Sequence, residues 1–203
     1  MIPGSATPIL LPVAAGGGLT VGQLYQGGYY AGTITYNTNG QDSWLLGSST
    51  PTYHLIMAPK SLGESSITLQ FKTSITADSQ TATWDGYYNT YSVFGSSSVH
   101  PAAEYCRNLT IAGYSDWYLP AVYEQGHAFK NLQNLSDWQL GGSEEYEFSG
   151  ATHYDQGVYW SSTSASPNTA DGYMTSFIPN GGTVFGFSKT DYSWVRAIRR
   201  VAV

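Results

Sequence analysis

Charged residues are scarce in this chain, whereas tyrosine, tryptophan and glycine are abundant. Among the 203 residues, 11% are charged, 15% are aromatic and 23 are glycines. Disordered segments and coiled coils both need far more charge than this. A chain of this length buries roughly 70% of the surface that its unfolded form exposes, which is enough for a substantial core. The composition therefore predicts a β-rich, loop-rich globular protein.

The charge balance and the cysteine content exclude several kinds of site. Eight Lys and Arg against 14 Asp and Glu give a net charge of -6, which excludes a large basic footprint for nucleic acid. Cys106 is the single cysteine, so neither an intrachain disulfide nor a four-cysteine zinc site can form. The four histidines lack metal-binding spacing, and no metal or cofactor is expected, although scattered loop oxygens leave calcium open. No apolar stretch approaches the ~20 residues of a membrane helix, so membrane insertion is not expected.

Two segments of different character divide the chain. We predict that residues 1–20 form an extended arm with a glycine-rich joint, and that residues 21–203 form one domain. Three prolines occur among the first twelve residues, and residues 16–18 are all glycine, which carries no side-chain constraint. Residues 9–11 are apolar and would be poorly accommodated in water. The arm is therefore expected to dock on another chain.

Strand patterns dominate both ends of the predicted domain. β-branched and aromatic runs bounded by Gly, Pro and Asn predict strands in these segments: residues 24–36 (with a bulge), 53–57, 67–71, 158–160, 172–178, 183–187 and 193–203. In the third of them, Ile67, Leu69 and Phe71 alternate with polar residues and should face inward. Asn180 followed by two glycines favours a hairpin, because Asn and Gly accept positive φ.

Two helices are expected between the strand regions. The first begins at Pro101 and ends before Gly113, and the second begins at Pro120. The second helix would bury three apolar residues, Val122, Phe129 and Leu132. Asp85-Gly86 with Asn89, and likewise Asp171-Gly172, are typical of turns rather than of calcium loops. Strands, two helices and then strands again predict an α+β fold.

Three of the four arginines of the chain lie close together, at positions 196, 199 and 200. In an alternating strand at least one of them would be partly buried. A buried charge is costly without a partner, so we expect a pair with a carboxylate such as Glu124 or Asp116. Anion binding by the three arginines together is the functional alternative.

Six short segments occur in order along the domain: residues 21–28, 55–60, 85–90, 113–120, 159–163 and 195–199. Each is a weak signal alone, but the set is specific. They include Tyr-Gln-Gly-Gly, Met-Ala-Pro-Lys, Ser-Asp-Trp-Tyr-Leu-Pro, Tyr-Trp-Ser-Ser-Thr and Val-Arg-Ala-Ile-Arg. Together they resemble the DUF1566 family, the C-terminal domain of the Legionella collagen-like adhesin, in the form found in bacteriophage virion proteins. The similarity runs from Val21 to the end of the chain.

This resemblance implies a C-type-lectin-like α+β fold with two helices, a twisted and mainly antiparallel sheet, and chain ends brought close together. It also implies a surface or virion component used for adhesion, often on trimeric stalks, with no established catalytic residue or cofactor. The chain departs from the family after Glu124, where Gln125 stands in place of leucine. It also lacks the Glu-Pro-Asn and Trp-Asn-Asp motifs with which true C-type lectins bind sugar through calcium.

The expected function is that of a non-catalytic structural protein on the surface of a bacteriophage virion. It would display an adhesion or receptor-binding domain as part of a tail or head fibre or a capsid decoration. The arm would contact other virion proteins, a homotrimer is expected, and the domain would face a host-surface glycan or protein. Tyr, Ser, Gly and Asn in loops suit such contacts. The expected contact residues are Asn168, Asp171, Tyr173, Asn180 and Tyr192.

Three alternatives remain open. The first is a purely architectural capsid-decoration or tail-joining protein, whose loops contact only other virion chains. The second is a secreted or bacterial cell-surface adhesin. The third is an enzyme, because formylglycine-generating oxidases share the lectin-like fold. Those enzymes depend on cysteines, and Cys106 lies inside a predicted helix.

Overall fold

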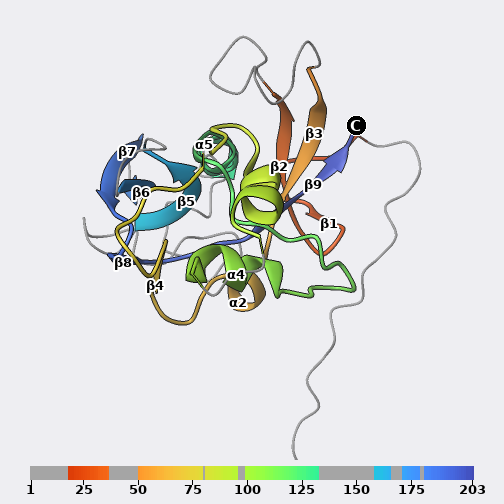
Figure 1. The fold of residues 1–203 in the computed structure, drawn as a ribbon. Coiled ribbons are helices and arrows are strands. Elements are labelled where there is room, and N and C mark those ends of the chain that lie inside the picture. Colours follow the sequence, from red (N-terminus) through yellow and green to blue (C-terminus); the bar gives the residue numbers. More distant parts are fainter. Residues whose placement is uncertain are drawn as a thin grey trace, which may run out of the picture.

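The computed structural model describes residues 18–36, 50–79, 81–95, 99–132, 158–165, 171–178 and 181–203 (Figure 1). At positions 171, 173–178 and 181–183 only the backbone is described. The predicted arm lies almost wholly outside the described residues.

The described strands form three antiparallel sheets, and short helices accompany them, so the predicted α+β class is confirmed. The largest sheet has the order β1-β2-β3-β9, namely Leu24–Tyr25, Gly28–Thr35, Thr52–Met57 and Ile198–Ala202. A second sheet pairs β4 (Leu69–Gln70) with β8 (Tyr192–Ser193), and a third joins β5 (Val158–Ser164), β6 (Asp171–Ile178) and β7 (Gly181–Ser188). The pairing of β3 with β9 joins the first and last parts of the domain.

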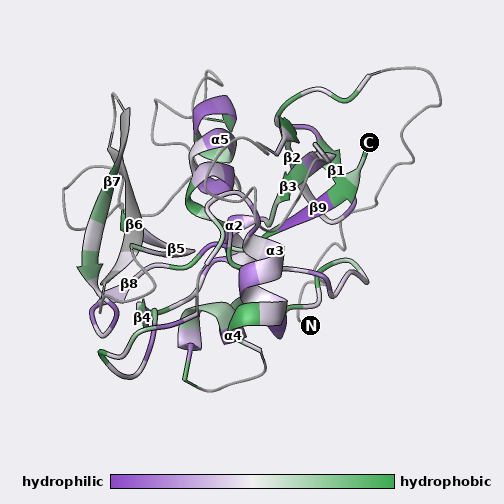
Figure 2. Cartoon of the chain, turned by 45° about the horizontal axis from the view of Figure 1, so that its top comes forward, coloured by the Kyte–Doolittle hydropathy of each residue, from purple (hydrophilic) through white to green (hydrophobic). Residues whose placement is uncertain are grey.

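Both predicted helices are present. Helix α4 (Pro101–Arg107) begins at the expected proline, and its Ala102 and Cys106 are fully buried. Helix α5 (Val122–Leu132) begins two residues after Pro120, and the three apolar residues expected on its inner face are buried. In Figures 1 and 2, α5 lies between the β2-β3-β9 strands and the β5-β6-β7 sheet, and it contacts both.

Three short helical segments were not predicted from the sequence: α2 (Lys60–Gly63), α3 (Gly86–Tyr88) and the π-helix η1 (Asn89–Val93). The turn interpretation of residues 85–89 was therefore wrong. The Asp85 carboxylate accepts a hydrogen bond from the Tyr88 N–H at 2.7 Å and so caps the start of α3. Asn89 is fully buried and bonds both backbone groups of Ala82. The second predicted turn, at Asp171, is instead the start of strand β6.

Two strand predictions were wrong in extent. The segment predicted at 67–71 contains a strand of only two residues, so Ile67 lies outside the paired region and is exposed, whereas Phe71 is buried. The C-terminal segment is divided into β8 and β9. Between β8 and β9 the backbone forms hydrogen bonds with another segment: the Ala197 N–H donates to the Gly63 carbonyl, in α2, at 3.0 Å.

Aromatic side chains fill the core, as the composition suggested. Trp117 and Trp160 are fully buried, and their indole N–H groups donate to the carbonyls of Tyr114 and Leu69 at 3.0 and 2.9 Å. The Phe71 ring contacts Trp160 with ring centroids 5.5 Å apart. Large rings with satisfied polar tips combine apolar burial with fixed orientation. Trp117, in the Ser-Asp-Trp-Tyr-Leu-Pro segment, therefore has a structural role in the core.

Two glycine substitutions should have opposite effects on stability. A Cβ on Gly86 would lie 2.5 Å from the Leu119 carbonyl oxygen and closer still to the Ala121 nitrogen, whereas a Cβ on Gly126 has no heavy atom within 4 Å. Gly86→Ala should lower the free energy of unfolding by about 1–3 kcal/mol through overpacking. Gly126→Ala, inside α5, should raise it by about 0.5–1 kcal/mol. Urea unfolding measures both, and equal effects of the two substitutions would contradict the close packing of α3 on α5.

Candidate functional site

Strands β6 and β7 form the predicted hairpin, through eight residue pairs from Asp171 with Ser188 to Ile178 with Gly181. The two glycines expected in the turn belong to β7, because residues 179–180 alone connect the paired ends. Among the described residues, β7 is an edge strand of the β5-β6-β7 sheet. One side of its backbone therefore has no neighbouring strand within the described part of the chain.

Three large apolar side chains of β7 are exposed. Val184 is 46% exposed, and Phe185 and Phe187 are each 40% exposed. The two phenylalanines lie on one face of the strand, with ring centroids 6.1 Å apart, and Val184 points to the other face. Figure 2 shows hydrophobic colouring along part of β7, at one side of the molecule. We call these three residues the hairpin surface, because clustered exposed apolar groups mark contact sites.

The five predicted contact residues have different outcomes. Tyr192, in β8, is 67% exposed and remains available for contact. Asp171 and Tyr173 lie in β6, where only the backbone is described. Asn168 and Asn180 lie outside the described residues. The phenylalanines of the hairpin surface were not predicted, because alternating aromatics usually indicate a buried face.

A buried ionic cluster lies at the base of the hairpin. Lys189 directly follows β7, and its Nζ lies 2.7 Å from Asp78 Oδ2. The other oxygen of Asp78 lies 2.5 Å from Lys72 Nζ and 2.9 Å from His100 Nε2. All four side chains are less than 10% exposed. The Asp78 cluster therefore ties the hairpin to three segments distant in sequence.

Hydrogen bonds control the ionisation of Asp78. Burial alone would raise the pKa of this carboxyl, but hydrogen bonds from His100, Lys189 and Lys72 outweigh it and hold the pKa well below its usual range. A depressed carboxyl pKa stabilises the fold above the ordinary pKa, and this contribution is lost in strong acid. Asp78 is thus ionised throughout the neutral range.

Removing the Asp78 charge should destabilise the protein strongly. Asp78→Asn leaves two buried lysines without a counter-charge, and the expected loss in free energy of unfolding is about 3–5 kcal/mol. A control is Asp191→Asn, because it makes the same substitution at an exposed position. That variant should cost less than about 1 kcal/mol. Urea midpoints distinguish the two, and a mild effect of Asp78→Asn would contradict the anchoring role.

A second buried carboxylate, Glu124 of α5, has only hydrogen-bonding partners. Its Oε1 accepts from the hydroxyls of Tyr36 and Tyr118, the latter at 2.8 Å. Its Oε2 accepts from the backbone N–H groups of Ala121 and Gly86 at 2.8 and 2.9 Å. Glu124 therefore joins α3, α5 and the end of β2. Of the two carboxylates expected as partners of an arginine, Asp116 rather than Glu124 forms the pair.

Burial raises the pKa of Glu124 from 4.5 to about 7, and the nearby Asp85 charge adds to this effect. Arg200 and the hydrogen bonds from Tyr36 and Ala121 act in the opposite direction. Near neutral pH, part of the population therefore carries a proton on Glu124.

Stability should consequently depend on pH through Glu124. Between pH 4.5 and about 7 the folded protein keeps a proton that the unfolded chain loses, so this contribution falls as the pH rises. Over this range the free energy of unfolding should fall by about 3 kcal/mol through Glu124. Glu124→Gln should remove this pH dependence. Urea unfolding of the wild type and the variant between pH 4 and 8 measures it. Parallel pH profiles of the two proteins would contradict the raised pKa.

The three C-terminal arginines have separate carboxylate partners. Arg199 Nε and NH2 donate to the two oxygens of Asp116 at 2.7 and 2.9 Å, which confirms the predicted pair. Arg196 NH1 lies 3.0 Å from Glu64 Oε2, and Arg200 NH1 lies 2.7 Å from an oxygen of Asp85. Because each charge is balanced locally, the three arginines do not form a joint anion site.

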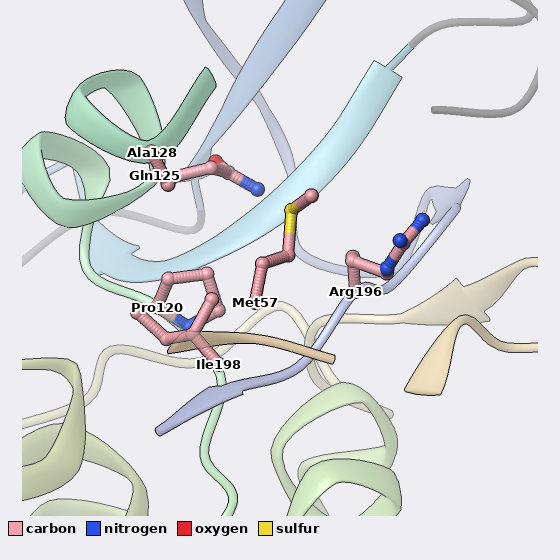
Figure 3. Close-up of a pocket in the computed structure, with 6 residues that line it drawn as sticks. All are labelled: Met57, Pro120, Gln125, Ala128, Arg196 and Ile198. Carbon is pink, nitrogen blue, oxygen red and sulfur yellow. The ribbon is translucent and has the colours of Figure 1, made fainter. Parts of the chain in front are cut away.

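An internal cavity of about 10 Å³ lies beside α5 (Figure 3). It is lined by Met57, Pro120, Gln125, Ala128, Arg196 and Ile198. The Oε1 atom of Gln125 is buried without a protein partner. This volume suits one water molecule and excludes a substrate.

In the described part of the chain, no three His, Cys, Asp or Glu side chains are arranged to hold a metal ion. The helices of this part are all too short or too polar to cross a membrane. Burial raises the pKa of the Cys106 thiol, which disfavours the reactive thiolate.

No family model matches this chain, and no curated protein matches its sequence.

Proposed function

We propose that this protein is a non-catalytic binding protein displayed on the surface of a bacteriophage virion, with a C-type-lectin-like domain that contacts its target through the hairpin surface. The virion setting and the lectin-like fold rest on the ordered segments that resemble the DUF1566 family. The binding role is supported by the geometry of β7.

The exposed hairpin surface is the observation that carries the binding role. Burying a large apolar side chain is worth about 1.5–3 kcal/mol, so Phe185 and Phe187, which share one face of β7, are a substantial source of binding energy. The ionic anchor at Lys189 supports the same role, because a fixed strand loses less entropy on binding than a free loop. Tyr192, predicted from the sequence, is an additional exposed ring.

The test is attachment of the purified, fluorescently labelled protein to intact bacterial cells, measured by flow cytometry over a panel of strains. Saturable attachment to at least one strain is expected. The double variant Phe185→Ser/Phe187→Ser should weaken it by at least roughly tenfold, the equivalent of one lost aromatic anchor.

The matched control is Leu62→Ser/Ile75→Ser, which changes two apolar residues that are 55% and 66% exposed outside the hairpin. This control should attach like the wild type. The absence of saturable attachment on every strain would contradict the adhesion role and favour the architectural alternative. Equal loss in both double variants would show that general surface hydrophobicity, rather than the hairpin surface, drives attachment.

A further inference from the structure

The outer side of β7 carries backbone groups that the described part of the chain leaves unpaired. The strand pairs with β6 through eight consecutive residues without a register shift, so no bulge interrupts it. Every second residue of such an edge strand directs its N–H and C=O away from the neighbouring strand. Among the described residues, no hydrogen bond joins the backbone of residues 184–187 to a group outside the sheet. The edge therefore presents donors and acceptors that repeat about every 6.8 Å.

Both faces of β7 are open along this edge. Val184 and Gly186 are exposed on one face, and Phe185 and Phe187 are exposed on the other. The side chains of a strand added along the edge would point alternately to these two faces. Gly186 leaves space for a large side chain opposite it, and apolar side chains on the other face would contact the phenylalanine rings.

The pattern of unpaired groups suits a polypeptide better than a glycan. An extended peptide offers N–H and C=O groups in the same alternation and at the same spacing, whereas the hydroxyls of a saccharide do not repeat in this way. In strand addition, hydrogen bonds between the two backbones give affinity and alternate side chains give specificity. Residues 181–188 include no charged residue and no proline, so nothing in the sequence of β7 blocks such pairing.

The charges of the protein favour a basic partner over a second copy of this chain. Five of the eight Lys and Arg are held in ion pairs with side chains at most 16% exposed, namely Lys72, Lys189, Arg196, Arg199 and Arg200. Few cations therefore offset the acidic residues at the surface, and with a net charge of -6 two copies repel each other in dilute solution.

The end of β7 at Ser188 has a local acidic character. Asp191, three residues beyond the strand, is exposed. Lys189 does not offset this charge, because its side chain is fully buried against Asp78. A basic residue of a partner strand would therefore be attracted to this end of the edge.

We propose that the outer edge of β7 accepts an extended segment of a target protein as an additional antiparallel strand. The segment has apolar residues at alternate positions and a basic residue at its N-terminal end, which an antiparallel pairing places beside Ser188 and Asp191. This inference rests on the proposed binding role of the hairpin surface, and it names the class of partner as a polypeptide rather than a glycan.

The experiment measures binding of fluorescein-labelled peptides to the full chain by fluorescence anisotropy at low ionic strength. The probe is the peptide Lys-Thr-Val-Thr-Val-Thr-Val-Ser, and a Kd of about 0.01–1 mM is expected. A second peptide carries N-methyl groups on its central threonine and the adjacent valine, which blocks both of its edges, and it should bind at least roughly tenfold more weakly. A third peptide has Glu in place of Lys and should bind at least roughly threefold more weakly, with the difference disappearing at high salt.

Two variants at one position test the edge itself. Val184→Lys places a charge on the edge, which is how natural sheets commonly prevent strand addition, and it should weaken binding of the probe at least roughly tenfold. Val184→Thr is the matched control, because threonine is also β-branched but uncharged, and it should bind like the wild type. Amide hydrogen exchange of the wild type provides an independent measurement, in which the probe should slow exchange at residues 184–187 and leave β9 unchanged.

Four results would overturn the inference. The probe shows no saturable binding at about 2 mM, the N-methylated peptide binds as tightly as the probe, or Val184→Lys binds as Val184→Thr does. The fourth is that the wild type sediments as a dimer whereas Val184→Lys sediments as a monomer, which would assign the edge to a second copy. If Val184→Lys does not fold, the hydrogen exchange of the wild type decides: slower exchange at residues 184–187 supports strand addition, and unchanged exchange contradicts it.

Failure of this inference is distinguishable from failure of the adhesion role. If the protein attaches to no bacterial strain but binds the probe, the adhesion role alone fails. If cell attachment depends on Phe185 and Phe187 but the probe does not bind, the strand-addition inference alone fails.

Discussion

The buried carboxylate of Asp78 is the interaction on which the arrangement of this domain most depends. It neutralises two buried lysines and receives a hydrogen bond from a histidine. These partners come from the end of β4, the start of α4 and the end of β7, which are far apart in the sequence. A protein with so few charges places several of them inside, where each must find a partner because an unpaired buried ion costs several kcal/mol. The need to pair these buried charges favours one packing arrangement of the chain.

Elements that local sequence determines were predicted well. Helix α4 begins at a proline and α5 begins two residues after one, both carry apolar residues at helical spacing, and the β6–β7 hairpin is marked by Asn-Gly-Gly. A pair between a buried arginine and either Glu124 or Asp116 was expected from the cost of buried charge, and the structure shows it between Arg199 and Asp116. The short helices α2, α3 and η1 were missed because tertiary contacts stabilise them. Asn89, for example, is held by Ala82 and by Ser162 of β5.

The candidate sites were harder to predict than the fold, for the same reason. Whether Phe185 faces the core or solvent depends on the position of β7 in the sheet. The order of the strands cannot be predicted from the residues of β7 alone. The Arg200–Asp85 ion pair likewise depends on the pairing of β3 with β9 and on the position of α3. Tyr192 is exposed, although it lies in strand β8 rather than in a loop, and its role as a contact residue stays a prediction.

The edge position of β7 affects how the protein behaves in concentrated solution. The strand contains neither a charged residue nor a proline, the two devices that commonly keep sheet edges from pairing with one another. In a concentrated solution, neighbouring molecules can align these edges and extend one sheet into the next.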